Sequence, residues 1–454
     1  MKLLTESYPH QIEAADKLAV VKVGALYMEM GTGKTRTALD LIQRRLLAAK
    51  IDKVIWFCPC SIKQDIQRNI MFHSDGTDGL IEFFGLESVS QSTRIYAQIL
   101  NVVQTHNVFL VVDESSMVKN YWALRTQRIT AIAELCRYRL LLSGTPVSRT
   151  EADLFAQWYI LDWRILGYKS FWSFSANHLE FDEYGKIRRT LNVDYLSDKI
   201  APYSYSIKKD ECLTLPPKKY QSEYFRLNYE QECHYEEIKE TLLDNVDDFK
   251  PETIYRLFTA LQLITSGRRI NACFPALVSE PFFKHSQENP RVIKLLNTVE
   301  CCRDKKIIVW CKYHHEIQEV VDALRARQTD KTILEYHGKL SIKARNSQLE
   351  EFSRDADILV ANKSCGGYGL NLQYCHQVIY YSNDFDWATR AQSEDRTHRI
   401  GQVHPVLIRD IIASSKVDGR IMSNLERKGN LAESFKREMK TRRDIRAWID
   451  GEDR

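Results

Sequence analysis

Short apolar runs alternate with helical patterns in two separate blocks of this chain, and this rhythm limits the folds that it can adopt. Eight runs have the length and composition of buried strands. They span residues 24–28, 53–58, 109–112 and 139–142 in the first block, and 306–310, 332–336, 357–361 and 377–381 in the second. Helical spacing of apolar residues is seen at 35–47, 314–327 and 341–353. The alternation predicts an α/β fold with two parallel-sheet domains in tandem, each wrapped by helices.

The rhythm breaks between the two blocks, where aromatic clusters and longer helical patterns replace it. We therefore expect a first domain, a mostly helical insert and connector, a second domain and a basic helical tail. Their expected bounds are 1–165, 166–290, 291–416 and 417–454. Within the insert, residues 179–191 have the pattern of a hairpin, with Arg188 and Arg189 on one arm.

Composition excludes several classes of protein. The chain has 454 residues, of which 44% are hydrophobic and 27% charged, the profile of a soluble globular protein. No apolar run approaches the roughly 18 residues of a membrane helix, and the start turns polar after two leucines, so we expect neither a membrane partner nor a secretory signal. The eleven cysteines lack paired metal-ligand spacing, which predicts reduced thiols, a cytoplasmic protein and no structural zinc. A net charge of +4 neither requires nor excludes a polyanionic partner.

The strongest local signal follows the first apolar run and opens a helical pattern. It reads Glu29-Met-Gly-Thr-Gly-Lys-Thr35. Glycines in such a turn let backbone N–H groups converge on a phosphate, and a lysine and a hydroxyl follow them. We predict that Gly31, Thr32 and Gly33 cradle the phosphates of ATP, that Lys34 reaches the β- and γ-phosphates, and that Thr35 ligates Mg²⁺.

An acidic pair ends another predicted strand of the first block, at Asp113-Glu114. A carboxylate at a strand tip can hold magnesium, and a second one can polarise the attacking water. We therefore predict that Asp113 serves the metal and that Glu114 is the catalytic base. An acidic pair alone is also typical of a strand-end cap, so the prediction depends on the glycine loop that precedes it in the chain.

Five further motifs resemble those of superfamily 2 helicases and translocases. They are Tyr8-Pro-His-Gln11, Phe57-Cys-Pro-Cys-Ser61, Leu142-Ser-Gly-Thr-Pro146, Ser364-Cys-Gly-Gly-Tyr-Gly-Leu-Asn-Leu372 and Gln392-x-x-x-Arg396-x-x-Arg399-Ile-Gly-Gln402. The resemblance implies two RecA-like domains, with Gln11 as the adenine reader and Gly369 near the nucleotide. It also implies that Arg396 and Arg399 act on the γ-phosphate as fingers, with Gln392 beside them. Their spacing of three residues predicts one helical face for both arginines.

Within that superfamily the details are similar to the Swi/Snf group. The wording from Arg396 to Gln402, the pair Asp386-Trp387 and the stretch from Leu213 to Lys218 all match that group. One departure is the box Asp113-Glu-Ser-Ser116, where the group usually shows DEAH or DEGH. This departure puts a histidine-mediated link to the motif at Leu142–Pro146 in doubt. The compact chain resembles bacteriophage branch-migration helicases and annealing-helicase cores, so the host cytoplasm is the expected location if the source is viral.

DNA is the implied partner, held by backbone-directed contacts that read no sequence. The candidate contacts come from loops after predicted strands and from the hairpin. They are Ser61, Lys63, Lys312, Tyr313, Lys339, Gly366, Gly367, Arg188 and Arg189. The hairpin fits either a wedge that splits strands or an ordinary surface hairpin. A cluster of Phe171, Trp172 and Phe174 fits either the core of the insert or a base-stacking platform.

The resemblance implies an ATP-dependent DNA helicase or translocase that works on forked, branched or duplex DNA. Branch migration requires little net energy, because one base pair forms for each that opens. We therefore predict unwinding and branch migration, with a monomeric motor compatible with the sequence and other protein partners unidentified. The alternative is a duplex translocase that remodels protein–DNA complexes without separating strands. RNA is disfavoured because the wording of the last motif matches the DNA group.

Overall fold

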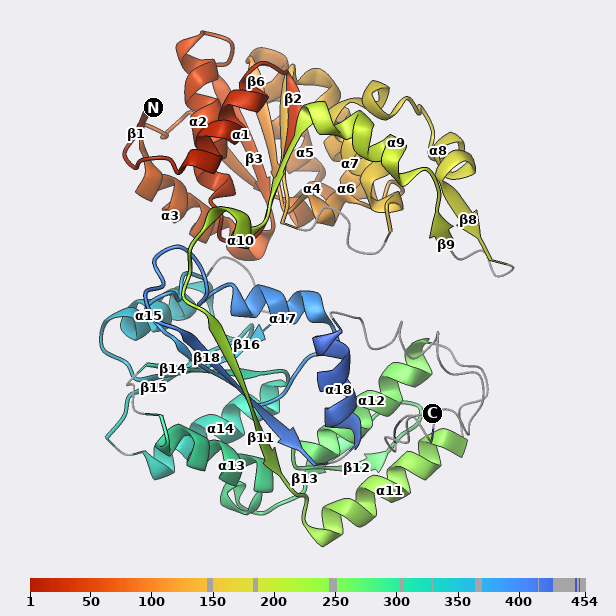
Figure 1. The fold of residues 1–454 in the computed structure, drawn as a ribbon, viewed down its shortest axis with the longest axis vertical. Coiled ribbons are helices and arrows are strands. Elements are labelled where there is room, and N and C mark those ends of the chain that lie inside the picture. The colour runs from red at the N-terminus through yellow and green to blue at the C-terminus, as the bar shows by residue number, and fades with distance from the viewer. Residues whose placement is uncertain are drawn as a thin grey trace. The chain divides into compact units, whose positions relative to one another are not determined.

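The chain divides into two units, Met1–Thr214 and Leu215–Arg454, and each is described by itself (Figure 1). The computed structural model describes residues 1–144, 150–182, 187–244, 251–302, 306–328, 330–363, 370–414, 416–427, 446 and 449. The segment expected as a single insert and connector is divided at Thr214. Its first part lies in unit 1 and its second part in unit 2.

Unit 1 is built on a six-stranded sheet whose neighbouring strands all run parallel. In spatial order the strands are β10 (Ser204–Ile207), β2 (Val23–Met28), β7 (Tyr138–Leu142), β6 (Val108–Asp113), β3 (Lys53–Cys58) and β5 (Ile81–Gly85). β2, β3 and β6 are almost continuous runs of buried residues, as expected for a sheet covered by helices on both faces. The ends of β2, β7 and β6 lie side by side, and this order positions the predicted site.

Helices cover both faces of this sheet (Figure 1). The described helices of the unit are α1 (Pro9–Ala19), α2 (Lys34–Leu47), α3 (Lys63–His73), α4 (Leu86–Gln91), α5 (Thr93–Thr105), α6 (Leu124–Leu135), α7 (Ala152–Leu166), α8 (Phe171–His178), α9 (Val193–Ile200) and α10 (Lys209–Cys212). Three short 3₁₀ turns are η1 (Cys60–Ile62), η2 (Ser115–Val118) and η3 (Ala201–Tyr203). Two antiparallel pairs complete the unit, β1 (Lys2–Leu3) with β4 (Ser74–Asp75) and β8 (Leu179–Phe181) with β9 (Ile187–Thr190). The second pair falls within the span 179–191 that was predicted as a hairpin.

Unit 2 contains a second six-stranded sheet, also parallel throughout. In spatial order its strands are β11 (Lys218–Phe225), β18 (Val406–Ala413), β17 (Gln377–Tyr380), β14 (Ile307–Cys311), β16 (Ile358–Asn362) and β15 (Ile333–Tyr336). Successive side chains of β14 enter different cores, with Val309 in one cluster and Ile308 and Trp310 in another. The two sheets confirm the predicted α/β fold.

The helices of unit 2 are α11 (Tyr229–Asp244), α12 (Pro251–Thr265), α13 (Pro290–Glu300), α14 (His314–Arg327), α15 (Ile342–Arg354), α17 (Trp387–Glu394) and α18 (Lys416–Glu426). A two-stranded pair, β12 (Arg268–Ala272) with β13 (Val278–Pro281), and the turn η4 (Ser286–Glu288) lie between α12 and α13 in the chain. Most of the basic tail predicted at 417–454 lies outside the described residues; its described start is α18.

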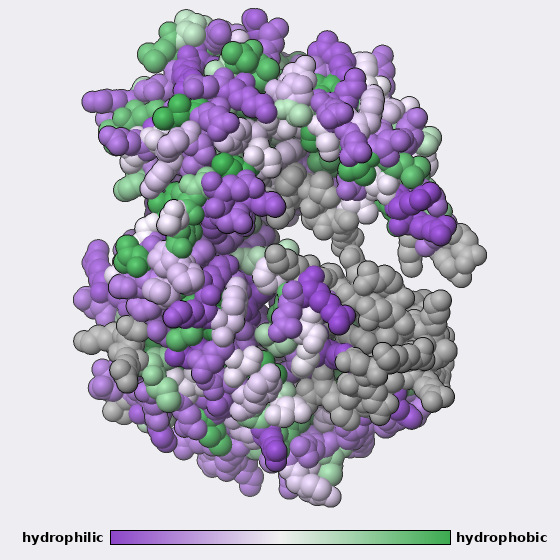
Figure 2. Space-filling model, viewed as in Figure 1, coloured by the Kyte–Doolittle hydropathy of each residue, from purple (hydrophilic) through white to green (hydrophobic). Residues whose placement is uncertain are grey.

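The described part of the chain has three further features. On the face drawn in Figure 2, hydrophilic residues predominate and hydrophobic ones form small separate patches. Among the described residues, no helix has both the length and the apolar character that crossing a membrane requires. The same residues contain no group of three or more His, Cys, Asp or Glu side chains that could hold a metal ion.

Candidate active site

The glycine loop predicted to bind phosphate connects β2 to α2. Gly31 and Gly33 have φ values of +79° and +95°, a backbone region that disfavours residues with a Cβ. The Thr32 hydroxyl donates to the Glu29 carbonyl at 2.7 Å and closes the turn. α2 begins at Lys34, so the free N–H groups of its first turn belong to the loop that carries the lysine. The local sequence thus builds the strand–loop–helix geometry that an anion site needs.

Gln11 lies directly over this loop from α1. Its amide Nε2 donates to the Thr32 carbonyl at 3.0 Å, and its Oε1 accepts the Tyr8 N–H at 3.1 Å. A ring nitrogen of His10 also lies 2.8 Å from the Thr32 carbonyl oxygen. A Cβ on Gly33 would collide with the Gln11 amide. Gln11 therefore supports the loop itself, in addition to its predicted role as adenine reader.

Lys34 extends back over the end of β2. Its ammonium donates to the Met28 carbonyl at 2.9 Å and to the Glu29 carbonyl at 3.4 Å. Its positive charge also acts on Asp113 at the end of β6, where it lowers the carboxyl pKa. The lysine and the carboxylate, which are far apart in the sequence, are thus brought together by the strand order of the sheet.

Asp113 and Glu114 differ sharply in environment. Asp113 is buried, and burial, followed by the neighbouring Glu114 charge, raises its pKa to about 7 despite Lys34. Glu114 has a φ of +52° and its N–H donates to Asp113 Oδ1 at 3.0 Å. A buried carboxyl with a raised pKa gains most from a divalent cation that favours its ionised form. Asp113 therefore suits a divalent cation, and the role of the Thr35 hydroxyl as a second ligand stays a prediction.

The turn after the acidic pair is tied to α7. The Ser115 hydroxyl donates to Gln157 Oε1 at 2.7 Å, and Gln157 Nε2 donates to the Asp153 carbonyl at 2.9 Å. Both Ser115 and Gln157 are fully buried. Ser115 thus makes a fixed contact one residue before Ser116, the position where the Swi/Snf group usually has histidine. Sequence reasoning missed Gln157, because nothing in the chain marks it as the partner of Ser115.

The motif after β7 approaches the phosphate loop through Gly144. A Cβ at this position would lie 3.1 Å from Met30 Cγ and 3.5 Å from Lys34 Nζ. Ser143 continues the strand pairing, because its N–H donates to the Leu26 carbonyl at 3.1 Å. Thr145 and Pro146 lie outside the described residues. The described half of the motif is therefore in direct contact with the loop.

In unit 2 the two predicted arginine fingers do not share a helical face, contrary to their spacing. α17 ends at Glu394, and both arginines lie in the turns that follow. The Arg396 carbonyl accepts the Leu372 N–H at 3.0 Å, a contact from another segment of the chain. Gln402 fixes the turn by donating to the Thr397 carbonyl at 3.1 Å. Gln392 lies within α17 and is half-buried.

Arg399 is close to Arg396 and to the end of the preceding motif. Burial and then the Arg396 charge lower its pKa to about 10. One of its terminal nitrogens donates to Asn371 Oδ1 at 2.5 Å and to the Leu370 carbonyl at 3.4 Å. Two guanidinium groups held near each other form a strong positive centre suited to a phosphate. Gly366, Gly367 and Gly369 of the preceding motif lie outside the described residues.

A buried ion network that sequence reasoning missed anchors α17. Arg390 donates to Asp410 at 2.5 and 3.0 Å and to Glu394 at 2.7 Å. Glu394 also accepts from Lys218 at 2.8 Å and from the Tyr220 hydroxyl at 2.9 Å. The network joins the helix before the arginine turn to β18 and β11. The only sequence signal for it was the Pro-Pro-Lys218 stretch, which matched the connector of the Swi/Snf group.

Lys312 and Tyr313, two predicted DNA contacts, point into unit 2. The Lys312 ammonium donates to Gln262 Oε1 at 2.8 Å and lies 3.1 Å from the centre of the Phe385 ring. The Tyr313 hydroxyl donates to the same oxygen at 2.9 Å. Burial lowers the pKa of Lys312 to about 7. These internal contacts argue against a direct role for either residue in binding DNA.

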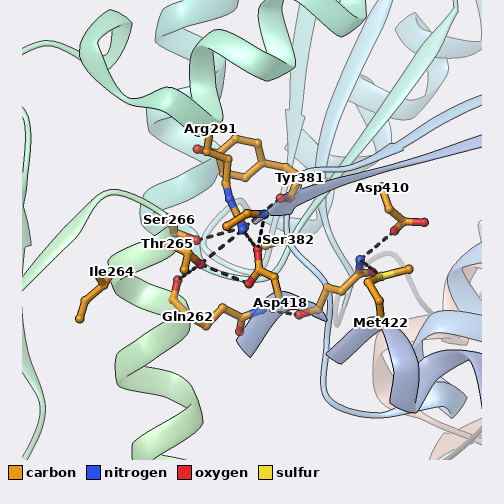
Figure 3. A network of polar contacts seen from close by, with 12 residues as sticks. Gln262, Ile264, Thr265, Ser266, Arg291, Tyr381, Ser382, Asp410, Asp418 and Met422 are labelled. Atoms are coloured by element: carbon orange, nitrogen blue, oxygen red, sulfur yellow. Dashed lines mark hydrogen bonds and ion pairs between the residues drawn. The ribbon is translucent and has the colours of Figure 1, made fainter. Parts of the chain in front are cut away.

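Gln262, the partner of Lys312 and Tyr313, belongs to a larger polar network (Figure 3). Arg291 is completely buried and donates to the Tyr381 carbonyl at 3.0 Å and to Thr265 Oγ1 at 3.3 Å. It also forms an ion pair with Asp418 of α18. Gln262 donates to the Asn383 carbonyl at 2.8 Å. The network thus joins α12, α13 and α18 to the segment that follows β17.

The remaining predicted DNA contacts are solvent-accessible. Ser61 is exposed in η1, Lys63 is half-buried at the start of α3, and Lys339 is exposed after β15. Arg188 and Arg189 project from β9, and both reach Glu180, at 3.3 and 2.6 Å. These side chains are placed to meet a ligand from solvent, and their contact with DNA stays a prediction.

Comparisons with known proteins match both units. The model of the SNF2-related domain matches residues 81–273, and that of the helicase conserved C-terminal domain matches residues 289–401. An uncharacterized ATP-dependent helicase of Mycoplasma pneumoniae is 25% identical over 69% of this chain and 29% of its own length. A rat SWI/SNF-related regulator of chromatin is 23% identical over 72% of this chain and 37% of its own length. The chain thus spans well under half the length of these curated relatives.

A solved structure, the Sulfolobus solfataricus SWI2/SNF2 ATPase core in complex with dsDNA, is similar over 96% of this chain and 93% of that one. The sequence identity is 20% and the TM-score 0.40. The SNF2-related match covers Asp113 and Glu114 and the motif at 142–146, and the helicase C-terminal match covers Arg396 and Arg399. The chain belongs to the Swi/Snf-like family of superfamily 2 helicases and translocases.

Proposed function

We propose that this protein is an ATP-dependent DNA helicase and translocase that acts on forked or branched DNA. The observation that carries the proposal is in unit 1, where strand order brings Lys34 of the phosphate loop within electrostatic reach of the buried Asp113. A phosphate-binding lysine beside a buried, metal-suited carboxylate is the arrangement that nucleotide hydrolysis requires. The family match and the relatives' names, which include an ATP-dependent helicase, support the same activity.

Each residue then has a defined task. The loop from Gly31 to Thr35 binds the phosphates, and Lys34 neutralises charge on them. Asp113 and Thr35 would hold Mg²⁺, which when bound neutralises phosphate charge. Glu114, whose backbone is fixed against Asp113, accepts a proton from the attacking water.

Unit 2 supplies the second half of the proposed reaction. Arg396 and Arg399 form a positive centre that would stabilise charge on the transferring phosphoryl group. The turn is held by Gln402 and by the anchored helix α17, so the guanidinium groups keep a fixed position within unit 2. Because hydrolysis would need groups from both units, each ATP cycle would alternate two arrangements of the units and move bound DNA.

The first test uses two variants of unit 1. Lys34→Ala should abolish both ATP binding and DNA-stimulated hydrolysis. Glu114→Gln should lower hydrolysis by about 10²–10⁴-fold, the usual contribution of a general base, while ATP binding persists. Full activity of both variants would refute the proposal. RNA of the same length as the DNA serves as the control activator, and equal stimulation by RNA would contradict the DNA assignment.

The second test concerns the DNA substrate. A forked duplex and a four-way junction, each with labelled strands, are incubated with the protein and ATP, and strand exchange is followed. Exchange that requires ATP and is lost in Glu114→Gln supports action on branched DNA. No exchange, together with hydrolysis stimulated by plain duplex, would contradict it.

The alternative is a duplex translocase that remodels protein–DNA complexes without separating strands. It is favoured by the relative named as a SWI/SNF-related regulator of chromatin. Displacement of a protein roadblock from duplex DNA, without release of either strand, would select this alternative.

A further inference from the structure

Four aromatic side chains form a surface on unit 1 that the ATP site does not use. This aromatic surface consists of Tyr121, Trp122, Phe171 and Trp172. The ring centres of Trp122 and Trp172 lie 6.4 Å apart. Trp122 is 56% exposed and Trp172 is 72% exposed. Phe171 lies 6.3 Å from Trp122, and Tyr121 lies 5.1 Å from it. Of the aromatic cluster that the sequence analysis singled out, Phe174 is buried in the core, whereas Trp172 is too exposed to be a core residue.

The aromatic surface has a rigid base. Phe155 of α7 is buried and packs 5.5 Å from Phe171 and 5.2 Å from Tyr121. The Ser170 hydroxyl accepts the Ser173 N–H at 3.2 Å and fixes the start of α8. Exposed tryptophans on a fixed base offer flat apolar faces at little cost in conformational entropy. Such faces suit a flat ligand.

The aromatic surface is connected to the catalytic carboxylates through one loop. Trp122 follows Glu114 by way of η2, and its N–H donates to Asn120 Oδ1 at 3.0 Å. α7 holds this loop at two points, through the Ser115–Gln157 hydrogen bond and a Lys119–Asp153 ion pair at 3.4 Å. α7 also carries Phe155, so the same helix supports both the aromatic surface and the loop that follows the acidic pair.

Charge next to the aromatic surface indicates the ligand. α8 runs directly into β8, and the β8–β9 hairpin lies beside it (Figure 1). Arg188 and Arg189 on that hairpin both pair with Glu180, and 71% and 67% of their side chains stay exposed. Lys169 is also exposed just before α8. Aromatic faces beside positive charge are the combination that binds single-stranded nucleic acid, with bases stacked and phosphates neutralised.

We infer that the aromatic surface binds unpaired bases of single-stranded DNA by stacking on Trp122 and Trp172. Bases within a duplex already stack on each other and present only their edges, so the aromatic surface discriminates against intact duplex. The inference rests on the proposed DNA function and deepens it, because a motor that opens a fork exposes unpaired bases. The link through η2 then places strand capture beside the catalytic carboxylates.

The test measures binding of a fluorescent oligo-dT strand and of a duplex of equal length, both without ATP. Trp122→Ala and Trp172→Ala should each weaken binding of the single strand by about 5- to 100-fold. Binding of the duplex should stay unchanged. Trp122→Phe and Trp172→Phe keep an aromatic face and should retain most of the single-strand affinity. Tyr229→Ala, which removes an exposed aromatic ring of unit 2, is the matched control.

Three results would overturn the inference. They are single-strand binding by the alanine variants at the wild-type level, an equal loss for single strand and duplex, and no binding of DNA by the wild type. If an alanine variant fails to fold, wild-type tryptophan fluorescence is titrated with oligo-dT and compared with that of Trp172→Phe. Quenching that is absent in the wild type, or unchanged in the variant, would also overturn it. DNA-stimulated ATP hydrolysis that survives these negative results leaves the proposed function standing and rejects only the stacking site.

Discussion

Gly144 packs against Lys34, because a Cβ on residue 144 would lie 3.5 Å from the lysine Nζ and 3.1 Å from Met30 Cγ. The second of these distances is too short for relaxed packing, so Gly144→Ala must push Met30, a residue of the phosphate loop, away by a few tenths of an ångström. We expect a loss of about tenfold in ATP hydrolysis, since small misplacements of phosphate-binding groups are costly. Steady-state kinetics and the affinity for a fluorescent ATP analogue measure the effect.

Gly419→Ala is the matched control for that substitution. Gly419 lies in α18, and an added Cβ would meet nothing within 4 Å. Alanine is the better helix former, so this variant should gain up to about 1 kcal/mol in stability and keep wild-type hydrolysis. Equal losses of activity in the two glycine variants would contradict a specific contact at Gly144.

Ser115 should contribute to stability and to catalysis through the same hydrogen bond. Ser115→Ala removes the hydroxyl that donates a hydrogen bond to Gln157 Oε1 in the buried interior. The free energy of unfolding should therefore fall by about 1–3 kcal/mol. The turn that follows Glu114 loses an anchor, so kcat should fall while ATP affinity is kept. Denaturant unfolding and steady-state kinetics measure the two effects.

A double variant separates the hydrogen bond from other effects of the substitution. Ser115→Ala with Gln157→Leu replaces both polar partners by apolar groups, and this is less costly than removing one. The double variant should therefore recover part of the stability lost by the single one. Strictly additive losses would show that Ser115 and Gln157 do not act together.

Asp418 should be critical for unit 2, because it pairs with the fully buried Arg291 (Figure 3). Asp418→Ala leaves that guanidinium without its carboxylate in the interior, which typically costs about 3–5 kcal/mol. Thermal unfolding of the full chain measures the loss. Glu300→Gln breaks the exposed pair with Arg327 and should change the unfolding temperature little. Similar effects of the two substitutions would contradict a structural role for the buried pair.

Sequence reasoning predicted most of the central strands because their signal is local. The span 53–58 coincides with β3, and the strands that carry the acidic pair and the glycine loop begin one residue earlier than expected. Buried parallel strands are apolar on both faces, so each stands out in the chain. The glycine loop was equally visible, because its positive φ values require glycine.

The edge strands β10 and β11 were missed for the opposite reason, whereas the edge strand β15 was predicted. β5 and the inner strand β18 were not predicted either. β11 was predicted to be part of a connector. It is exposed along most of its length, and its sequence shows no alternation of apolar and polar residues. β10 has only four residues. Both pair along one edge only, with β18 and with β2, so their sequences carry little of the burial that marks a strand. The division of the middle segment at Thr214 followed from these two strands and could not be read from the sequence.

The same limit applies to the site in unit 2. The spacing of Arg396 and Arg399 fits a helix, but α17 ends before them, and the Arg396 carbonyl accepts a hydrogen bond from Leu372. Lys312 reads as a basic residue after a strand, yet its ammonium lies on the Phe385 ring. Both outcomes depend on residues far away in the chain, and local patterns do not contain them.

Glu319 of α14 should make the stability of the protein depend on pH. Its pKa is raised from 4.5 to about 7, chiefly by burial and also by the Glu316 charge, against the opposing Asn289 hydrogen bond and Arg268 charge. Between pH 4.5 and 7 the folded chain therefore keeps a proton that the unfolded chain releases, so this group's contribution to stability falls as pH rises through that range.

Glu319→Gln removes the titration but can still accept a hydrogen bond from Asn289 Nδ2, which lies 3.0 Å from the present Oε1. We expect this variant to exceed the wild type in stability by about 3 kcal/mol at pH 8 and by little at pH 4. Denaturant unfolding at both pH values measures the difference, and Glu351→Gln, at an exposed position of α15, should show no such dependence. A gain that is equal at the two pH values would contradict a buried, protonated Glu319, since only a group that titrates between them can make the gain vary.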